Sequence, residues 1–504
     1  MQENNSAEQI LVSLNESSHL KGCILAYGHF TTIHLGHIRY LRHARSLGEN
    51  LVIALAGDGP SNQVPIYPFN QQERAEALNI LGLADAIVGL NSDDLTQAVK
   101  ILRPRVLVLG TEFEDSSQFQ EALKLQKNLG GNIQFHAGEV SYASADLLSS
   151  SEKDLRYQRM IQFSAACRRQ GLTREILIES MKSWSNSRLI VLGDTIVDQY
   201  TACEALGMSA EAPVVVVREL ANKNFIGGAA VVAAHIRALG AHVDLVSVVG
   251  NDSTADMVET ELENQTIGNL LIRDPSRPTT FKKRYVVENQ KLFRVSRLEQ
   301  HNLDSEIEEK LITNLTKLAP NANGIVVSDF VYGVITPRVL EVVQDLAKKY
   351  GLYLFGDSQC SSQVGSITRF QNFSLLCPNE RELRLALQDK DSGLERLSQR
   401  LLTNTHCDRL ILKLAGEGFI AYDKDKDGKV LSQPFPALSV NPLDVAGAGD
   451  SVLSVMATGI ASFQPMMATA AIACCMGALA VDSMGNTPIG FDTLQNSLDE
   501  LLPE

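Results

Sequence analysis

Short hydrophobic runs alternate with segments of helical periodicity along the first part of the chain. The hydrophobic runs lie at residues 23–27, 51–56, 86–88 and 106–109. The helical segments between them lie at residues 38–47, 71–81 and 95–102. Apolar strands that alternate with helices are typical of βαβ units around a parallel sheet. Since the pattern ends near Ser150, we expect residues 1–150 to form one α/β domain.

The pattern changes after residue 150 and then starts again. Residues 151–186 mix charged and apolar side chains at helical spacing, which predicts a helical linker. A new apolar run at residues 189–192 opens a second alternating series, so residues 187–504 are expected to form a second α/β domain. Further hydrophobic runs fall outside this series and predict additional strands, at residues 214–217, 281–287 and 292–295.

Composition narrows the classes of function. The chain has 504 residues, with 45 Lys+Arg against 59 Asp+Glu and a net charge of −14. This acidic balance argues against a broad nucleic-acid or anionic-membrane surface, although it permits a local basic pocket. The 8 cysteines include no C-x-x-C pair, which favours free thiols over a zinc site or disulfides. Without a signal-peptide pattern or a run of 18 apolar residues, we expect a cytoplasmic protein that is not inserted in a membrane.

Residues 28–37 form the first chemically distinctive segment. They follow an apolar run directly and lead into a helical pattern. His34 and His37 are three residues apart, so they share a face of the first helical turn, whose main-chain N–H groups are unpaired. Two imidazoles beside such a turn could hold nucleotide phosphates while the α-phosphate is attacked. The alternative is a pair of exposed histidines at the start of a helix.

This segment resembles the H-x-G-H signature of the cytidylyltransferase-like nucleotidyltransferases, and the resemblance covers about residues 21–148. It implies a Rossmann-like domain in which His34 and His37 are catalytic phosphate donors. It also implies nucleotide contacts at Gly28, Phe30, Gly36, Arg74 and Ser144.

The first domain departs from the family pattern at several positions. Thr31 stands where the family usually has Asp, and Leu109 stands where it has Lys. The segment at residues 58–63 has no positive charge where the family has a basic loop. These departures leave open a regulatory domain that binds a nucleotide but has lost its catalytic activity.

Residues 444–450 form the second distinctive segment, with the sequence D-V-A-G-A-G-D before a helical pattern. Gly447, Ala448 and Gly449 can direct main-chain N–H groups into one space at the start of a helix, as an anion hole for a transferred phosphoryl group. Asp450 at its edge can take the proton of an attacking hydroxyl. The alternative is a glycine turn with an aspartate cap.

This motif resembles the D-T-x-G-A-G-D signature of the ribokinase-like sugar kinases, and the resemblance spans residues 187–504. It implies phosphoryl transfer from ATP with Mg²⁺, and a small β-lid over the sugar that often forms a dimer interface. We therefore expect a sugar phosphate and ATP as substrates and a homodimer formed through this domain. The residues implied are Asp198, Gly227 and Gly228 for the sugar, Asn379 and Glu382 for Mg²⁺ through water, and Gly416 and Gly418 for the nucleotide. Residues 470–481, with Gly485, match the helix and the turn that line the adenine pocket.

Two local matches narrow the subfamily. Residues 207–214 and 277–282 resemble segments of the heptose 7-phosphate kinases, which are commonly fused to a heptose 1-phosphate adenylyltransferase of the H-x-G-H type. The resemblance therefore implies ADP-heptose synthesis, with the two domains in reversed order.

The second domain also departs from its family. Val231 replaces an Asn, while Tyr332 and Gln359 each replace a Lys. Lys413 stands where Thr is usual. These changes leave open a kinase for a different sugar or a nucleoside.

Overall fold

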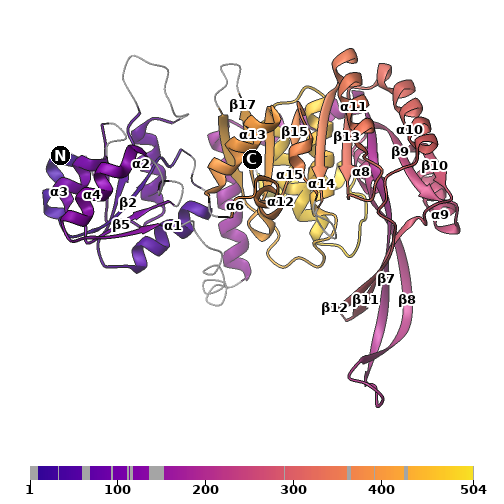
Figure 1. The fold of residues 1–504 in the computed structure, drawn as a ribbon, viewed down its shortest axis with the longest axis horizontal. Coiled ribbons are helices and arrows are strands. Elements are labelled where there is room, and N and C mark those ends of the chain that lie inside the picture. Colours follow the sequence, from indigo (N-terminus) through magenta and orange to yellow (C-terminus); the bar gives the residue numbers. More distant parts are fainter. Residues whose placement is uncertain are drawn as a thin grey trace. The chain divides into compact units, whose positions relative to one another are not determined.

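The computed structural model divides the chain into two compact units (Figure 1). The first unit comprises Met1–Ser151 and Asp389–Gln399, and the second comprises Glu152–Gln388 and Arg400–Glu504. The structure describes residues 10–31, 33, 35–58, 69–91, 95–110, 113, 117–135, 152–288, 290–359, 365–390, 392–424 and 430–502.

The first unit contains a six-stranded parallel sheet with strand order β1-β4-β3-β2-β5-β6. Its strands are β1 (Leu11–Ser13), β2 (Ile24–Gly28), β3 (Leu51–Leu55), β4 (Ala86–Gly89), β5 (Val106–Leu109) and β6 (Asn132–Phe135). Its helices are η1 (Leu14–Leu20), α1 (Leu35–Ser46), α2 (Gln71–Ile80), α3 (Leu95–Leu102), η3 (Ser117–Phe119) and α4 (Gln120–Asn128). The Rossmann-like α/β prediction is confirmed.

The apolar strands of this sheet are buried on both faces. Ile24 and Ala26 pack with residues of α1 and α2, whereas Leu25 and Tyr27 pack with residues of α3 and α4. Such two-sided burial explains why the strands are continuous hydrophobic runs rather than alternating ones. The hydroxyl of Tyr40 on α1 donates to the main-chain oxygen of Val108 at 2.6 Å and so ties α1 to β5.

Residues predicted as a linker form α6 (Glu152–Arg169), α7 (Arg174–Lys182) and η5 (Ser183–Asn186). Thr173 caps α7, because its hydroxyl accepts a hydrogen bond from the N–H of Ile176. Phe163 of α6 and Trp184 of η5 are fully buried in the apolar core of the second unit. These helices are therefore part of that core.

The main sheet of the second unit has the strand order β10-β9-β7-β13-β14-β15-β16-β17-β18. Its strands run parallel up to β16, and β17 and β18 are antiparallel. The strands are β7 (Arg188–Met208), β9 (His242–Gly250), β10 (Gly268–Asp274), β13 (Gly324–Asp329), β14 (Tyr353–Ser358), β15 (Leu375–Leu376), β16 (Arg409–Lys413), β17 (Phe419–Lys424) and β18 (Val430–Phe435).

The helices that follow β7 in the chain complete the fold. They are α8 (Ala229–Ala238), α9 (Ser253–Asn264), α10 (Ser305–Leu318), η6 (Ala319–Asn321), α11 (Pro337–Tyr350), η7 (Ile367–Arg369), α12 (Glu380–Leu387), α13 (Leu394–Thr405), η8 (Ala415–Glu417), α14 (Ala448–Ala461), α15 (Met466–Val481) and α16 (Phe491–Leu501). The helices α8, α14 and α15 share the largest apolar core with the sheet. In the described ranges, no helix is both long enough and apolar enough to cross a bilayer.

The additional strands predicted from the sequence form a lid. β8 (Val215–Gly228) pairs antiparallel with β7, and β11 (Thr280–Val287) pairs with both β7 and β12 (Gln290–Arg297). Figure 1 shows β7, β8, β11 and β12 projecting from the second unit. The prediction of a C-terminal α/β domain with a small β-lid is confirmed.

Candidate functional site

The chemistry-bearing residues of the second unit gather at the carboxyl ends of its parallel strands, where ligands bind in open α/β sheets. Asp357 lies near the end of β14, Gln359 follows that strand, and Lys413 ends β16. The amide of Gln359 donates to Asp450 Oδ1 at 3.0 Å, and Lys413 Nζ lies 2.8 Å from Asp357 Oδ2. These contacts join the strand ends to the start of α14.

The predicted anion hole is the N-terminus of α14. Gly447 is the N-cap of this helix and has a left-handed φ of 80°. A Cβ atom there would lie only 2.3 Å from Asn486 Oδ1, so this position requires glycine. A Cβ atom at Gly449 would lie 3.1 Å from Lys413 Nζ, which places a cation beside the first turn. Free N–H groups, the helix dipole and this ammonium together favour an anion.

Asp450 lies buried in the first turn of α14. Burial, followed by the charge of Asp357, raises the pKa of Asp450 to about 8, while Lys413 opposes the shift. A carboxyl group that titrates near neutral pH can both take up and release a proton, as a general base requires.

Lys413 is a candidate site residue to which the sequence assigned no role. Burial lowers its pKa, but the charges of Asp357 and Glu382 outweigh burial and the pKa is raised overall. The side chain therefore remains charged in a largely buried site.

Asn379 and Glu382 form a reciprocal cap at the start of α12. The Asn379 side chain accepts from the N–H of Glu382, and the Glu382 carboxylate accepts from the N–H of Asn379, both at 2.8 Å. An isolated bridge pairs Asn379 with Lys413, so this cap adjoins the buried lysine.

The surroundings of this cap suit a hydrated divalent cation. Asp357 Oδ1 is buried without a hydrogen-bond partner, and Glu382 brings a second buried carboxylate close to Lys413. Among the described residues, no group of three or more His, Cys, Asp and Glu side chains could enclose a metal. Mg²⁺ is commonly held by one or two carboxylates, waters and substrate phosphates, and this donor set fits that mode.

The predicted sugar residues also lie together. Asp198 forms an ion pair with Arg284 and accepts a hydrogen bond of 3.1 Å from Asn486 Nδ2. A Cβ atom at Gly227 would lie 2.6 Å from Asp198 Oδ2. Gly228 has a φ of 61°, and a Cβ atom there would lie 2.2 Å from the main-chain oxygen of Asp194. Glycine is therefore needed beside Asp198.

Asn486 is a second residue missed from the sequence. Its amide nitrogen contacts Asp198, and its oxygen faces the Cα of Gly447. It thus connects Asp198, the predicted sugar residue, with the predicted anion hole. The only sequence signal was its position after Gly485, which matches the turn next to the adenine-pocket helix.

Lys282 and Arg284 on β11 were also missed. Because side chains two residues apart share a face of a strand, both can point to the same side of the lid. The Lys282 ammonium lies 5.0 Å from the ring centre of Phe330 and 5.3 Å from that of Tyr332. In the described ranges no carboxylate lies within ion-pair distance of this buried lysine. The alternation of residues 280–287 was the signal that could have revealed this cationic face.

Asp444, the first residue of the D-V-A-G-A-G-D segment, connects the anion hole to the lid. It accepts hydrogen bonds from Lys291 of β12, Tyr200 of β7 and the N–H of Ala446. Burial raises the pKa of Asp444, but the bonds from Lys291 and Tyr200 outweigh it and lower the pKa overall. Asp444 is therefore ionised and links the start of the motif to the lid strands β7 and β12.

The predicted nucleotide residues Gly416 and Gly418 lie at η8, the turn between β16 and β17. Val231, in contrast, is fully buried in α8, and Tyr332 is buried beneath Lys282.

The predicted site of the first unit is described only in part. His34 and Ser144 lie outside the described residues. His37 and Gly36 lie in the first turn of α1, and the His37 ring is 5.0 Å from that of the buried Phe30. A Cβ atom at Gly28 would lie 2.7 Å from the Phe30 ring. Gly28, Phe30 and His37 therefore pack closely together at the end of β2.

Arg74 is buried between loops of the first unit. Its guanidinium donates to the main-chain oxygens of His29 and Ala56, and it pairs with Asp58 at 2.8 Å. These hydrogen bonds fix the main chain of the segments that follow β2 and β3. Leu109 is fully buried in the apolar core.

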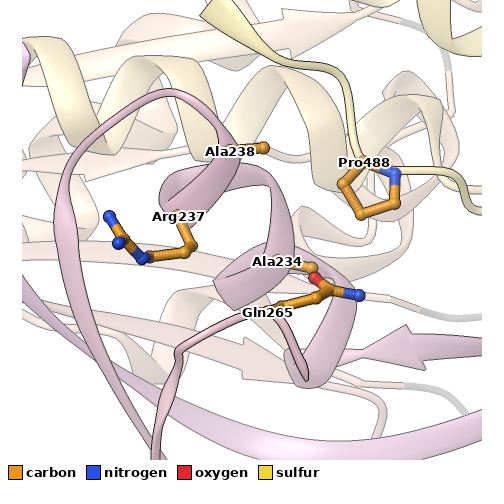
Figure 2. Close-up of a pocket in the computed structure, with 5 residues that line it drawn as sticks. All are labelled: Ala234, Arg237, Ala238, Gln265 and Pro488. Carbon is orange, nitrogen blue, oxygen red and sulfur yellow. The ribbon is translucent and has the colours of Figure 1, made fainter. Parts of the chain in front are cut away.

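A surface cavity of about 450 Å³ is lined by other residues (Figure 2). Its lining comes from α8, the end of α9 and the segment before α16, namely Ala234, Arg237, Ala238, Gln265 and Pro488. None of these is a predicted site residue.

Comparisons with known proteins agree with this geometry. Residues 186–492 match the pfkB family of carbohydrate kinases, and residues 25–165 match the cytidylyltransferase-like family. The chain is 31% identical over 306 residues to the bifunctional protein HldE of Geotalea uraniireducens, covering 60% of this chain and 61% of that protein. It is 30% identical over 318 residues to the HldE protein of Campylobacter jejuni subsp. jejuni serotype O:6, covering 62% of this chain and 65% of that protein. Each match therefore spans less than two thirds of the relative's length.

Among solved structures, phosphofructokinase-2 from Escherichia coli in complex with substrates and products has a TM-score of 0.53 at 16% identity, covering 62% of this chain and 99% of that chain. At this identity the likeness shows the fold alone. The family match covers more than half of the chain, and the homology to the bifunctional relatives is distant, with the domain order reversed. The chain therefore belongs to the pfkB family of carbohydrate kinases and carries a cytidylyltransferase-like domain in front of its kinase domain.

Proposed function

We propose that the second unit phosphorylates a sugar phosphate with MgATP, as in the heptose 7-phosphate kinases, and that the first unit transfers a nucleotidyl group to the resulting sugar 1-phosphate to give an ADP-sugar. The observation that carries the kinase proposal is the position of Asp450. This carboxyl group, whose pKa is raised to about 8, lies at the N-terminus of α14 beside a buried cation, Lys413.

The proposed reaction follows from these positions. Asp450 takes the proton of an acceptor hydroxyl, whose oxygen forms a bond to the γ-phosphorus of ATP as the bond from that phosphorus to the bridging oxygen breaks. The N–H groups of Gly447, Ala448 and Gly449 and the ammonium of Lys413 offset negative charge on the transferred group. Bound Mg²⁺ would supply further charge neutralisation on the phosphates, near Asn379, Glu382 and Asp357.

The lid supports an anionic acceptor. Lys282 is a buried ammonium that lies over two aromatic rings, and Arg284 of the same strand binds Asp198. The charge of Lys282 also acts on Asp450, where it opposes the rise in pKa, but no described carboxylate lies within ion-pair distance of it. A phosphate on the sugar would give Lys282 an anionic partner at that distance. The heptose identity rests on the resemblance of residues 207–214 and 277–282.

Acceptor-dependent ATP consumption tests this proposal. We expect turnover with heptose 7-phosphate, and an Asp450→Asn variant should lose about 10²- to 10⁴-fold in kcat while still binding ADP. Asp492→Asn, an exposed residue in the first turn of α16, is the matched control. No turnover with any of a panel of sugar phosphates, in protein that still binds ATP, would count decisively against the proposal.

A second candidate is a kinase for another sugar or a nucleoside, with a regulatory nucleotide-binding first unit. Gln359, which replaces a family lysine, contacts the proposed base directly. In the first unit, Leu109 is a core residue and Arg74 is bound to main-chain oxygens. Acceptor profiling, followed by product analysis with ATP and CTP present, separates this candidate from the first. If Asp450→Asn leaves biological function intact, phosphoryl transfer is not the role that matters.

A further inference from the structure

Arg159 of α6 reaches the turn that carries the predicted nucleotide residues. Its guanidinium donates to the main-chain oxygens of Ser439 and Gly416, the latter at 3.2 Å. Gly416 lies in η8, and Ser439 follows β18. One planar side chain therefore joins two segments that are more than twenty residues apart in the sequence.

The helix that carries Arg159 is firmly packed in the second unit. Phe163, Ala166 and Cys167 of α6 are fully buried in its apolar core. Gln170, just after α6, donates from Nε2 to Gln433 Oε1 of β18 at 3.2 Å. The position of Arg159 is thus set by the helix packing and not by its own contacts alone.

The same helix adjoins α15, which the sequence resemblance assigns to the adenine pocket. Burial, with the neighbouring Cys475 and Cys167, raises the pKa of Cys474, so the thiol of Cys167 lies near those of α15. Cys474 Sγ in turn donates to the main-chain oxygen of Pro436 at 3.0 Å, three residues before Ser439. α6 therefore contacts both the turn and the helix expected to flank the base.

The match to the kinase family begins only at residue 186, so α6 lies before it in the chain. We propose that α6 forms an added wall of the nucleotide site, in which Arg159 is a positioning residue that holds the 415–418 turn for an adenine nucleotide. This inference rests on the proposed function, because it assumes that the site takes ATP. It adds to that site a residue that lies before the kinase-family match and inside the cytidylyltransferase-like match at residues 25–165.

Nucleotide binding by the full chain, measured by calorimetry without an acceptor, tests this inference. Arg159→Met keeps the apolar stem but removes both hydrogen bonds, and we expect it to bind ADP about 5- to 20-fold more weakly. Arg159→Lys keeps the charge without the planar fork, and its affinity should be intermediate. The matched control is Arg156→Met, an exposed residue one turn earlier on α6.

A merely structural role for Arg159 would lower the thermal stability and affect both substrates. The positioning role instead predicts an increased KM for ATP, an unchanged KM for the acceptor and an unchanged melting temperature. ADP affinity equal to that of Arg156→Met would overturn the inference while leaving the proposed function intact. Failure of the unmodified chain to bind any adenine nucleotide would overturn both.

Hydrogen exchange on the unmodified chain gives a test that does not depend on folding of a variant. Saturating ADP should slow exchange of the main-chain amides in the 415–418 turn and in the part of α6 around Arg159. Protection of the turn without any change in α6 would contradict the inference.

Discussion

If Asp450 is the base that we propose, its carboxyl group sets the pH dependence of the kinase site. Burial and the charge of Asp357 raise its pKa to about 8. Only the ionised form accepts a proton, so kcat/KM should fall about tenfold per pH unit below 8 and level off above it. Initial rates between pH 6 and 9.5, with both substrates held well below KM, give this profile. A flat profile across this range would exclude Asp450 as the base.

Lys413 provides the second prediction at the scale of single residues. Removing it alone would leave the buried Asp357 without its cation, so the informative variant is the double change Lys413→Met with Asp357→Asn, compared with Asp357→Asn alone. Loss of a cation beside the anion hole should reduce kcat about 10²-fold with little change in KM for the acceptor. Lys424→Met, an exposed change on β17, is the control. A double variant with kcat within about twofold of that of Asp357→Asn would assign Lys413 a structural role.

Residues inside contiguous motifs could be predicted from the sequence, because their neighbours alone define the local geometry. Asp450 and Gly447 belong to one seven-residue segment, and Gly227 and Gly228 open a helix. Lys413 and Asn486 could not be assigned in this way. Their contacts with Gly449 and Gly447 arise from packing between elements that are distant in the chain.

At the scale of elements, β11 carries the prediction on acceptor choice. Lys282→Met keeps the stem that lies over Phe330 and Tyr332 but removes the charge. We expect KM for a phosphorylated acceptor to rise about 10- to 100-fold, with no change for its unphosphorylated counterpart. Lys283→Met, on the opposite face of β11, is the matched control. If KM changes equally for the two acceptors, Lys282 does not recognise the phosphate.

Element boundaries were predicted well only where an apolar pattern marks them. The predicted strand at residues 189–192 is the start of β7, which continues to Met208. The outer half of β7 is largely exposed, so it has no hydrophobic pattern that would mark it as a strand. The helices at residues 151–186 were expected as a linker, whereas Phe163 and Trp184 are buried in the core of the second unit. Their composition does not reveal which surface they cover.

At the scale of the whole molecule, the lid carries a concentration of exposed apolar side chains. They are Leu206, Met208, Val214, Val215, Val216, Leu220, Leu292, Phe293 and Val295. Exposed patches of this kind mark interaction sites, and the family resemblance leads us to expect a second copy of the lid as the partner.

Phe293→Glu and Leu220→Glu should therefore convert a dimer to a monomer in sedimentation and light-scattering measurements. Burying a carboxylate in an apolar interface is costly, whereas the same change on an open surface is tolerated. Ile80→Glu, at an exposed apolar position in the first unit, serves as the control. A monomeric unmodified chain at micromolar concentration would refute the dimer.

The 21 residues of β7 join the main sheet and the lid in a single strand. A lid that is attached through loops can move at those loops, but this lid continues the main sheet in β7 without a loop. Any closing movement must bend or twist the strand, and the sites best suited to do so are the register shifts at Ala202/Cys203 and Ala205/Gly207. The main sheet should then set the resting position of the lid, and the few residues at these register shifts should set its stiffness.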